Sequence, residues 1–93
     1  MSEQEQENAE QAAMERAQAV RRAHEEALLA RPNVVGVGVG LVRRGGALTG
    51  EVGIVVMVAH KLPPDALDPA DRIPAAIEGV PVDVQEVGEI RAH

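Results

Sequence analysis

The sequence predicts an α+β fold in which a long N-terminal helix packs on a small three-stranded, largely antiparallel sheet, in the order α-β-β-turn-β. Three patterns support this prediction. Residues 2–31 carry small apolar residues at helical spacing, residues 34–42 alternate valine with glycine, and residues 54–58 form an unbroken apolar run. The 93 residues suffice for one domain with one hydrophobic core.

The first segment, residues 2–31, is predicted to be one helix. Ser2 and Glu5 have the spacing of a capping box, and Pro32 stops the helix. A thin apolar stripe runs along it mostly at three- and four-residue steps, through Ala9, Ala13, Ala17, Val20, Ala27 and Leu28.

The length of this helix implies an overhang. Thirty residues at 1.5 Å per residue span roughly 45 Å, whereas a nine-residue strand spans roughly 30 Å. We therefore expect residues 1–12 to be a polar helical overhang or a disordered tail, and residues 13–93 to form a single α+β domain.

The next two segments are predicted to pair as an antiparallel hairpin. In the first strand, residues 34–42, one face carries Val35, Val37, Val39 and Leu41, and the other carries Gly36, Gly38 and Gly40. A glycine-rich turn over residues 43–50 leads to a second strand, residues 51–59, whose apolar run indicates that both faces are covered.

The remaining segments are a connector and a third strand. The connector, residues 60–79, contains one helical turn that begins at Asp68 and Pro69. In the third strand, valines alternate with other residues from Val80 to Val84. Pro81 cannot donate a hydrogen bond to a ladder, so this strand lies at an edge or Pro81 lies at its start.

The Val-Gly repeat resembles a dinucleotide-binding loop only superficially. That loop needs a third glycine three residues after the second and then a helix, but position 41 is Leu41 and a turn follows. Three strand glycines each cost roughly 0.5–1 kcal/mol relative to alanine, so a side-chain-free groove is their expected use. The groove accommodates either the protein's own alanine-rich helix, which we favour, or the backbone of a partner or an apolar peptide.

Composition excludes several classes of function. There is no aromatic residue and no cysteine, so stacked single-stranded bases, disulfides and thiolate metal sites are not expected. The net charge is −6, and both ends of the chain are acidic, which disfavours nucleic acid and anionic membrane surfaces. The acidic, polar N-terminus does not match a signal peptide and no apolar run reaches the length of a spanning helix, so we expect a cytoplasmic protein.

Catalytic and metal sites are not expected either. The only hydroxyls are Ser2 and Thr49, without an evident base beside them, and the carboxylates lie in polar segments where nothing raises their pKa. The three histidines, His24, His60 and His93, lack metal-ligand spacing, and Asp65, Asp68 and Asp71 do not match a calcium loop. The sequence therefore predicts no enzyme, no metal and no cofactor.

The chain also resembles a known family over residues 32–88. The residues that carry the resemblance are Pro32-Asn33 with the Val-Gly repeat, Gly50-Glu51 with Ile54-Val55-Val56, Lys61-Leu62-Pro63, Ile73-Pro74, Gly79 to Val84, and Glu86-Val87-Gly88. This stretch is similar to a small domain that precedes the protease domain in bacterial trypsin-like peptidase family proteins. The resemblance implies a non-catalytic accessory region, here without a protease domain because the sequence ends at His93.

These patterns lead to two hypotheses about function. The first is a non-catalytic protein-interaction or self-association module, a structural or accessory subunit whose partner is itself in a homo-oligomer or the product of a neighbouring gene. Its candidate interaction residues are Ala9, Ala13, Ala17, Val20, Gly36, Gly38, Gly40, Arg43 and Arg44. The alternative is a small-ligand or peptide-binding domain that uses the Arg43-Arg44 turn, the glycine-faced strand and His60.

Overall fold

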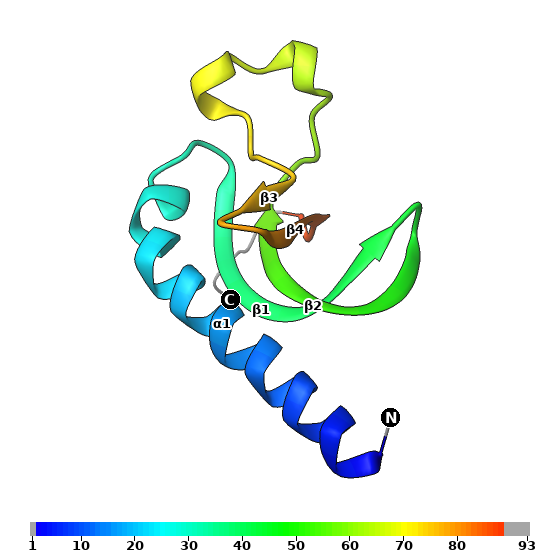
Figure 1. Cartoon of the computed structure of the whole chain (residues 1–93). Coiled ribbons are helices and arrows are strands. Elements are labelled where there is room, and N and C mark those ends of the chain that lie inside the picture. The colour runs from blue at the N-terminus through cyan, green and yellow to red at the C-terminus, as the bar shows by residue number, and fades with distance from the viewer. Residues whose placement is uncertain (1, 89–93) are drawn as a thin grey trace, which may run out of the picture.

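The computed structural model describes residues 2–88 and confirms the α+β class. One long helix lies against one sheet, and a connector with two 3₁₀ turns stands above the sheet (Figure 1). The elements are α1 (Glu3–Leu29), β1 (Val34–Arg44), β2 (Ala47–Val58), the 3₁₀ turns Pro64–Ala66 and Pro69–Asp71, β3 (Ala76–Ile77) and β4 (Val80–Glu86).

The sheet has four strands in the order β1-β2-β4-β3. β1 and β2 form the predicted antiparallel hairpin, and β3 and β4 form a second, very short antiparallel pair. β2 and β4 run parallel, which the sequence did not predict. The connector between β2 and β3 makes this possible, because a parallel pair needs a crossover of about a dozen residues or more. Pro81 is the second residue of β4, at the start of the strand as expected.

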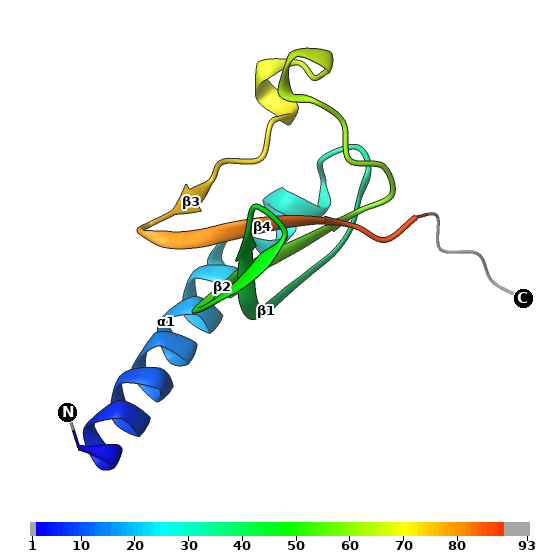
Figure 2. The same ribbon diagram turned by 90° about the vertical axis from the view of Figure 1, so that its right-hand side faces the viewer.

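The ends of α1 follow the sequence signals. The Ser2 hydroxyl accepts a hydrogen bond from the Glu5 backbone, and the Glu5 carboxylate accepts one from the Ser2 backbone, which completes the predicted capping box. Only Ala17, Val20 and Leu28 are buried, whereas every helical residue before Ala17 is exposed. The N-terminal half of the helix therefore runs out beyond the sheet (Figures 1 and 2).

The core lies between α1 and the valine face of the sheet. Its buried members come from three elements and are Ala17, Val20, Leu28, Ile54, Val56, Val58 and Val80. Val37 and Val39 of β1 pack against this cluster. The prediction that the helix docks on the glycine face is therefore wrong: the atoms nearest to a Cβ built at Gly36 or Gly40 belong to β2, and a Cβ built at Gly38 meets nothing within 4 Å. Burying valine side chains removes more apolar surface from water than covering glycine with alanine does. The helix therefore packs on the valine face of the sheet.

Two irregularities in the hairpin change which β1 side chains are buried. The register shifts between Val34 and Gly36 and again between Leu41 and Arg43. As a result Val34 packs against the core while Val35 is exposed, and Val42 is buried while Leu41 is exposed. The simple alternation expected from residues 34–42 therefore holds only between the two bulges.

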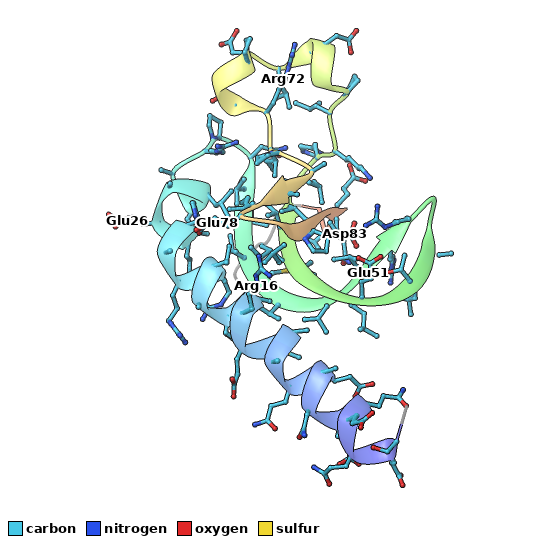
Figure 3. All side chains as sticks on the ribbon, in the orientation of Figure 1. Arg16, Glu26, Glu51, Arg72, Glu78 and Asp83 are labelled. Atoms are coloured by element: carbon cyan, nitrogen blue, oxygen red, sulfur yellow. The ribbon has the colours of Figure 1, made fainter. Side chains whose placement is uncertain are left out.

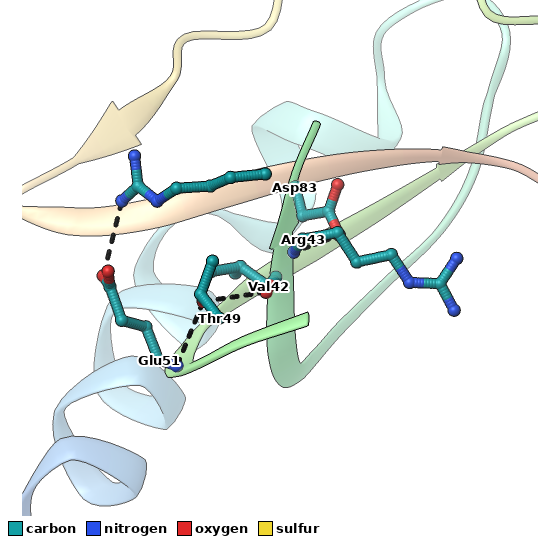
Figure 4. Close-up of polar contacts among 6 residues, drawn as sticks. Val42, Arg43, Thr49, Glu51 and Asp83 are labelled. Atoms are coloured by element: carbon teal, nitrogen blue, oxygen red, sulfur yellow. Dashed lines mark hydrogen bonds and ion pairs between the residues drawn. The ribbon is translucent and has the colours of Figure 1, made fainter. Parts of the chain in front are cut away.

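The hairpin turn is shorter than predicted. Gly45 and Gly46 make the turn with φ values of 57° and 84°, so both strands extend into the predicted loop. The Thr49 hydroxyl donates to the Val42 carbonyl at 2.9 Å and accepts from the Glu51 backbone at 3.1 Å (Figure 4). These bonds support the backbone where the second bulge interrupts regular pairing.

Candidate functional site

The outer edge of β1 is the first candidate surface. β1 lies at one end of the sheet order, so one of its edges faces away from β2. Between the two bulges, residues 36–41 keep a regular register with β2. Backbone groups alternate between the two edges of an antiparallel strand, so about half of those in this segment point outward. Within residues 2–88, no strand pairs with this outer edge.

The sequence of β1 gives this edge little protection. Natural proteins guard sheet edges with charged residues, prolines, bulges or very short strands. Residues 34–42 contain no charged residue and no proline, and β1 is 11 residues long. Of these devices, β1 has one bulge near each end. The edge therefore has the chemistry of a strand that accepts another strand.

The glycine face of β1 is only partly covered. A Cβ atom built at Gly36 would lie 2.8 Å from the end of the Met57 side chain, and one built at Gly40 would lie 3.6 Å from Val55. A Cβ atom at Gly38 would meet nothing within 4 Å. The predicted groove is thus bordered by two β2 side chains and open at Gly38, beside the outer edge.

The two predicted arginines lie at the tip of the hairpin. The Arg44 side chain pairs with Glu51 at 3.4 Å, and both groups are more than half exposed. The Arg43 backbone N–H donates to the Asp83 carboxylate at 3.0 Å, while the Arg43 side chain extends away from it (Figure 4). The tip is therefore tied to β4 through a backbone contact, and the two guanidinium groups do not converge on one site.

A pocket of about 290 Å³ lies at the other end of the hairpin. The connector, the end of β2 and β4 surround it, and its lining residues are Pro32, Asn33, Val58, His60, Lys61, Leu62, Leu67, Asp71, Arg72, Ile73 and Val84. Of the residues proposed for ligand binding, this pocket contains His60 but neither arginine of the hairpin tip, because Arg44 pairs with Ala47 at the far end of β2. Sequence reasoning missed the pocket because it did not predict the parallel β2–β4 pair.

Asn33 fixes one wall of this pocket. Its backbone is left-handed at φ 76°, a conformation that asparagine tolerates better than most residues. Its side-chain oxygen accepts from the His60 backbone N–H at 2.8 Å, and its side-chain amide donates to the His60 carbonyl. The Lys61 backbone N–H donates to the Glu86 carboxylate at 2.8 Å. The entry to β1 and the exit from β4 therefore hold the start of the connector in place.

On the other side of the molecule, α1 holds the turn between β3 and β4. A guanidinium nitrogen of Arg16 donates to the Glu78 carbonyl at 2.9 Å, and His24 Nε2 lies 2.9 Å from the Glu78 carboxylate. Figure 3 shows Arg16 and Glu78 meeting between the helix and this turn. Glu78 and Gly79 both have positive φ, at 49° and 79°, as a two-residue hairpin turn requires. The flank of α1 that carries these two side chains therefore faces the β3–β4 side of the sheet.

The alanine stripe of the helix is divided between core and surface. Ala17 and Val20 are buried in the domain's own core, so their side chains are not on the surface of this chain. Ala9 and Ala13 are exposed, and Ala13 borders a shallow depression with Arg16, Gly79 and Pro81. The predicted interaction residues that remain accessible are thus the strand glycines, the exposed alanines and the two arginines at the hairpin tip.

Comparison with known proteins adds no family to this description: no family model matches the chain, and no curated protein matches it. Among residues 2–88, no three histidine, aspartate or glutamate side chains are placed to hold a metal ion together. In the same part of the chain, α1 does not combine the length and apolar character of a membrane-crossing helix.

Proposed function

We propose that this chain is a non-catalytic protein-interaction module that binds an extended protein segment as an additional strand along the outer edge of β1. The observation that carries the proposal is a long edge strand without charge or proline between Val34 and Val42. In strand addition, backbone hydrogen bonds supply affinity and alternate side chains supply specificity. An accessory role of this kind agrees with the resemblance to the domain that precedes bacterial trypsin-like proteases.

The engagement of the two hydroxyl groups supports a non-catalytic role. Ser2 caps α1, and Thr49 bridges the Val42 carbonyl and the Glu51 backbone. A hydroxyl nucleophile needs a base within hydrogen-bond reach and donors for an oxyanion. The hydrogen bonds of both hydroxyls described above are to backbone groups, so each hydroxyl supports the local backbone.

A labelled peptide tests strand addition. The probe is the β1 sequence itself, residues 34–44, whose two arginines keep it in solution. We expect it to bind the intact chain, measured by fluorescence anisotropy, because its backbone can complete the ladder at the open edge. A matched peptide with prolines at the positions of Gly38 and Val39 lacks one N–H on each edge, and we expect at least a tenfold weaker affinity.

The two peptides separate backbone pairing from hydrophobic adhesion. Equal affinity for both would show that the backbone of the peptide is not used. No binding of the unmodified peptide up to its solubility limit would likewise contradict strand addition. Either result would contradict the proposed function.

The pocket supports a second candidate function, the binding of a small, largely apolar molecule. Its volume is near the lower end of known ligand pockets, and apolar side chains with a few polar groups are the usual lining. We expect a ligand present at about 100 times its dissociation constant to stabilise the fold by about 2.7 kcal/mol. A thermal-shift screen with short-chain carboxylates, ketones and alcohols measures this.

A pair of variants localises any stabilisation to the pocket. Leu62→Arg places a charge on the pocket wall and is expected to remove the thermal shift. Leu48→Arg, at the exposed hairpin tip, is the control and is expected to keep it. A screen without stabilisation, or a shift that Leu62→Arg leaves unchanged, would exclude this pocket as the site.

A further inference from the structure

We infer that the strand added to β1 is β1 of a second copy, so that two chains form a symmetric dimer with one continuous sheet. This inference rests on the proposed function of the edge and names its partner. Two features carry it: the self-complementary sequence of β1 and the exposed apolar residues on one flank of α1.

The Val-Gly repeat is complementary to itself in antiparallel pairing. If a two-fold axis passes through Gly38, Val37 lies opposite Val39 of the second copy, and Gly36 lies opposite Gly40 of the second copy. Directly opposite residues share one face of a sheet. The valine faces of the two chains then form one surface, and both α1 helices lie on the same side of it.

The flank of α1 that faces the open edge can be assigned from the contacts on its other side. Arg16 and His24 hold the turn of β3 and β4, so the opposite flank points towards β1 at the other end of the sheet order. At 100° per residue that flank is a continuous line of residues at steps of three and four. The line consists of Met14, Gln18, Arg21, Glu25 and Leu29.

This flank carries the exposed large apolar side chains of the described helix. Met14 is 40% exposed and Leu29 is 44% exposed, and they lie at its two ends. Between them Arg21 pairs with Glu25 at 2.8 Å. A two-fold axis perpendicular to the sheet makes the two helices antiparallel. It therefore brings Met14 of one copy towards Leu29 of the second copy and lets the arginine and glutamate of both chains alternate.

The absence of cysteine from the chain allows a direct test by crosslinking. A Cβ atom at position 38 would meet nothing within 4 Å, so Gly38→Cys is expected to be compatible with the fold. Opposite Cβ atoms in an antiparallel pair lie about 4.5–5.5 Å apart, close to the span of a disulfide. Under mild oxidation at micromolar concentration, we expect Gly38→Cys to form a covalent dimer at least ten times faster than Leu48→Cys, whose side chain is exposed at the hairpin tip.

Sedimentation equilibrium of the unmodified chain gives the second readout, which does not depend on the folding of a variant. A concentration-dependent dimer is expected. A strict monomer at 100 µM or more, or a Gly38→Cys crosslink no faster than the Leu48→Cys control, overturns the dimer. If the β1 peptide still binds in that case, only the identity of the partner is wrong; if it does not bind, the proposed function of the edge fails as well.

Discussion

Replacing Gly53 with alanine is expected to lower the free energy of unfolding by about 3 kcal/mol or more, because there is no room for a methyl group at this position. A Cβ atom at Gly53 would lie 2.3 Å from the Pro81 carbonyl oxygen and 2.5 Å from a methyl carbon of Val42. The first of these atoms belongs to the backbone of β4. The added methyl group can fit only if β4 and the buried Val42 side chain move away.

Two other glycines serve as matched controls, measured by urea unfolding monitored by circular dichroism. Gly38→Ala adds a methyl group that meets nothing within 4 Å and is expected to raise the free energy of unfolding by about 0.5–1 kcal/mol. The atom nearest to the added methyl group of Gly36→Ala would be the flexible end of Met57, which can move, so this variant is expected to be close to neutral. Equal destabilisation by the Gly38 and Gly53 variants would contradict the described packing of the sheet.

Replacing Leu28 with alanine is the second change with a large expected effect. The Leu28 side chain is 2% exposed and packs in the core with Ile54 and Val56. Loss of a buried leucine side chain costs about 2–5 kcal/mol, through lost burial and the cavity that remains. A domain of this size has a total stability of about 5–15 kcal/mol, so this one change removes a large share of it.

Leu29 provides the control for this prediction because it is the same residue type at the next helical position. Its side chain is 44% exposed, and Leu29→Ala is expected to change the free energy of unfolding of the monomer by about 0.5 kcal/mol or less. Both variants are compared by thermal and urea unfolding at a concentration where the chain is monomeric. A larger loss in Leu29→Ala than in Leu28→Ala would mean that α1 is rotated relative to the description given above.

Local chemistry made the helix and the hairpin predictable from the sequence. The capping box of Ser2 and Glu5 gave the start of α1, and Pro32 marked its end to within a few residues. Asp68 and Pro69 correctly predicted a short helical turn, which is the 3₁₀ turn Pro69–Asp71. These signals act between neighbouring residues, so they do not depend on how the chain folds back on itself.

Features that depend on contacts between distant residues were not predictable in the same way. The glycine and valine faces of β1 can each accept a helix sterically, and only the burial of Val37 and Val39 against the core decides between them. The bulges depend on the pairing of β1 with β2 and on the support from Thr49. The parallel pairing of β2 with β4 depends on the path of the connector, and the pocket depends on that pairing.

The candidate site was predictable only in part, because some of its features follow from local sequence and others depend on contacts between distant residues. The strand glycines stood out because glycine is costly in a strand, and Gly38 proved to be open. The open outer edge beside it was not evident, because the position of a strand in the sheet order is set by all the other strands. Ala17 and Val20 fitted an interaction stripe by their spacing, but that spacing is shared by residues that face a helix's own core.

Residue-resolved amide hydrogen exchange tests the central claim, that the outer edge of β1 accepts another strand, most directly. In the isolated monomer, the outward N–H groups of residues 36–41 are expected to exchange quickly, while those that point to β2 are protected. Addition of the β1 peptide, or an increase in chain concentration, is expected to slow the exchange of the outward N–H groups at least tenfold. The exchange rates of the N–H groups of Gly45 and Gly46 at the hairpin tip are expected to stay unchanged. Unchanged exchange of the outward N–H groups under saturating peptide would contradict the claim.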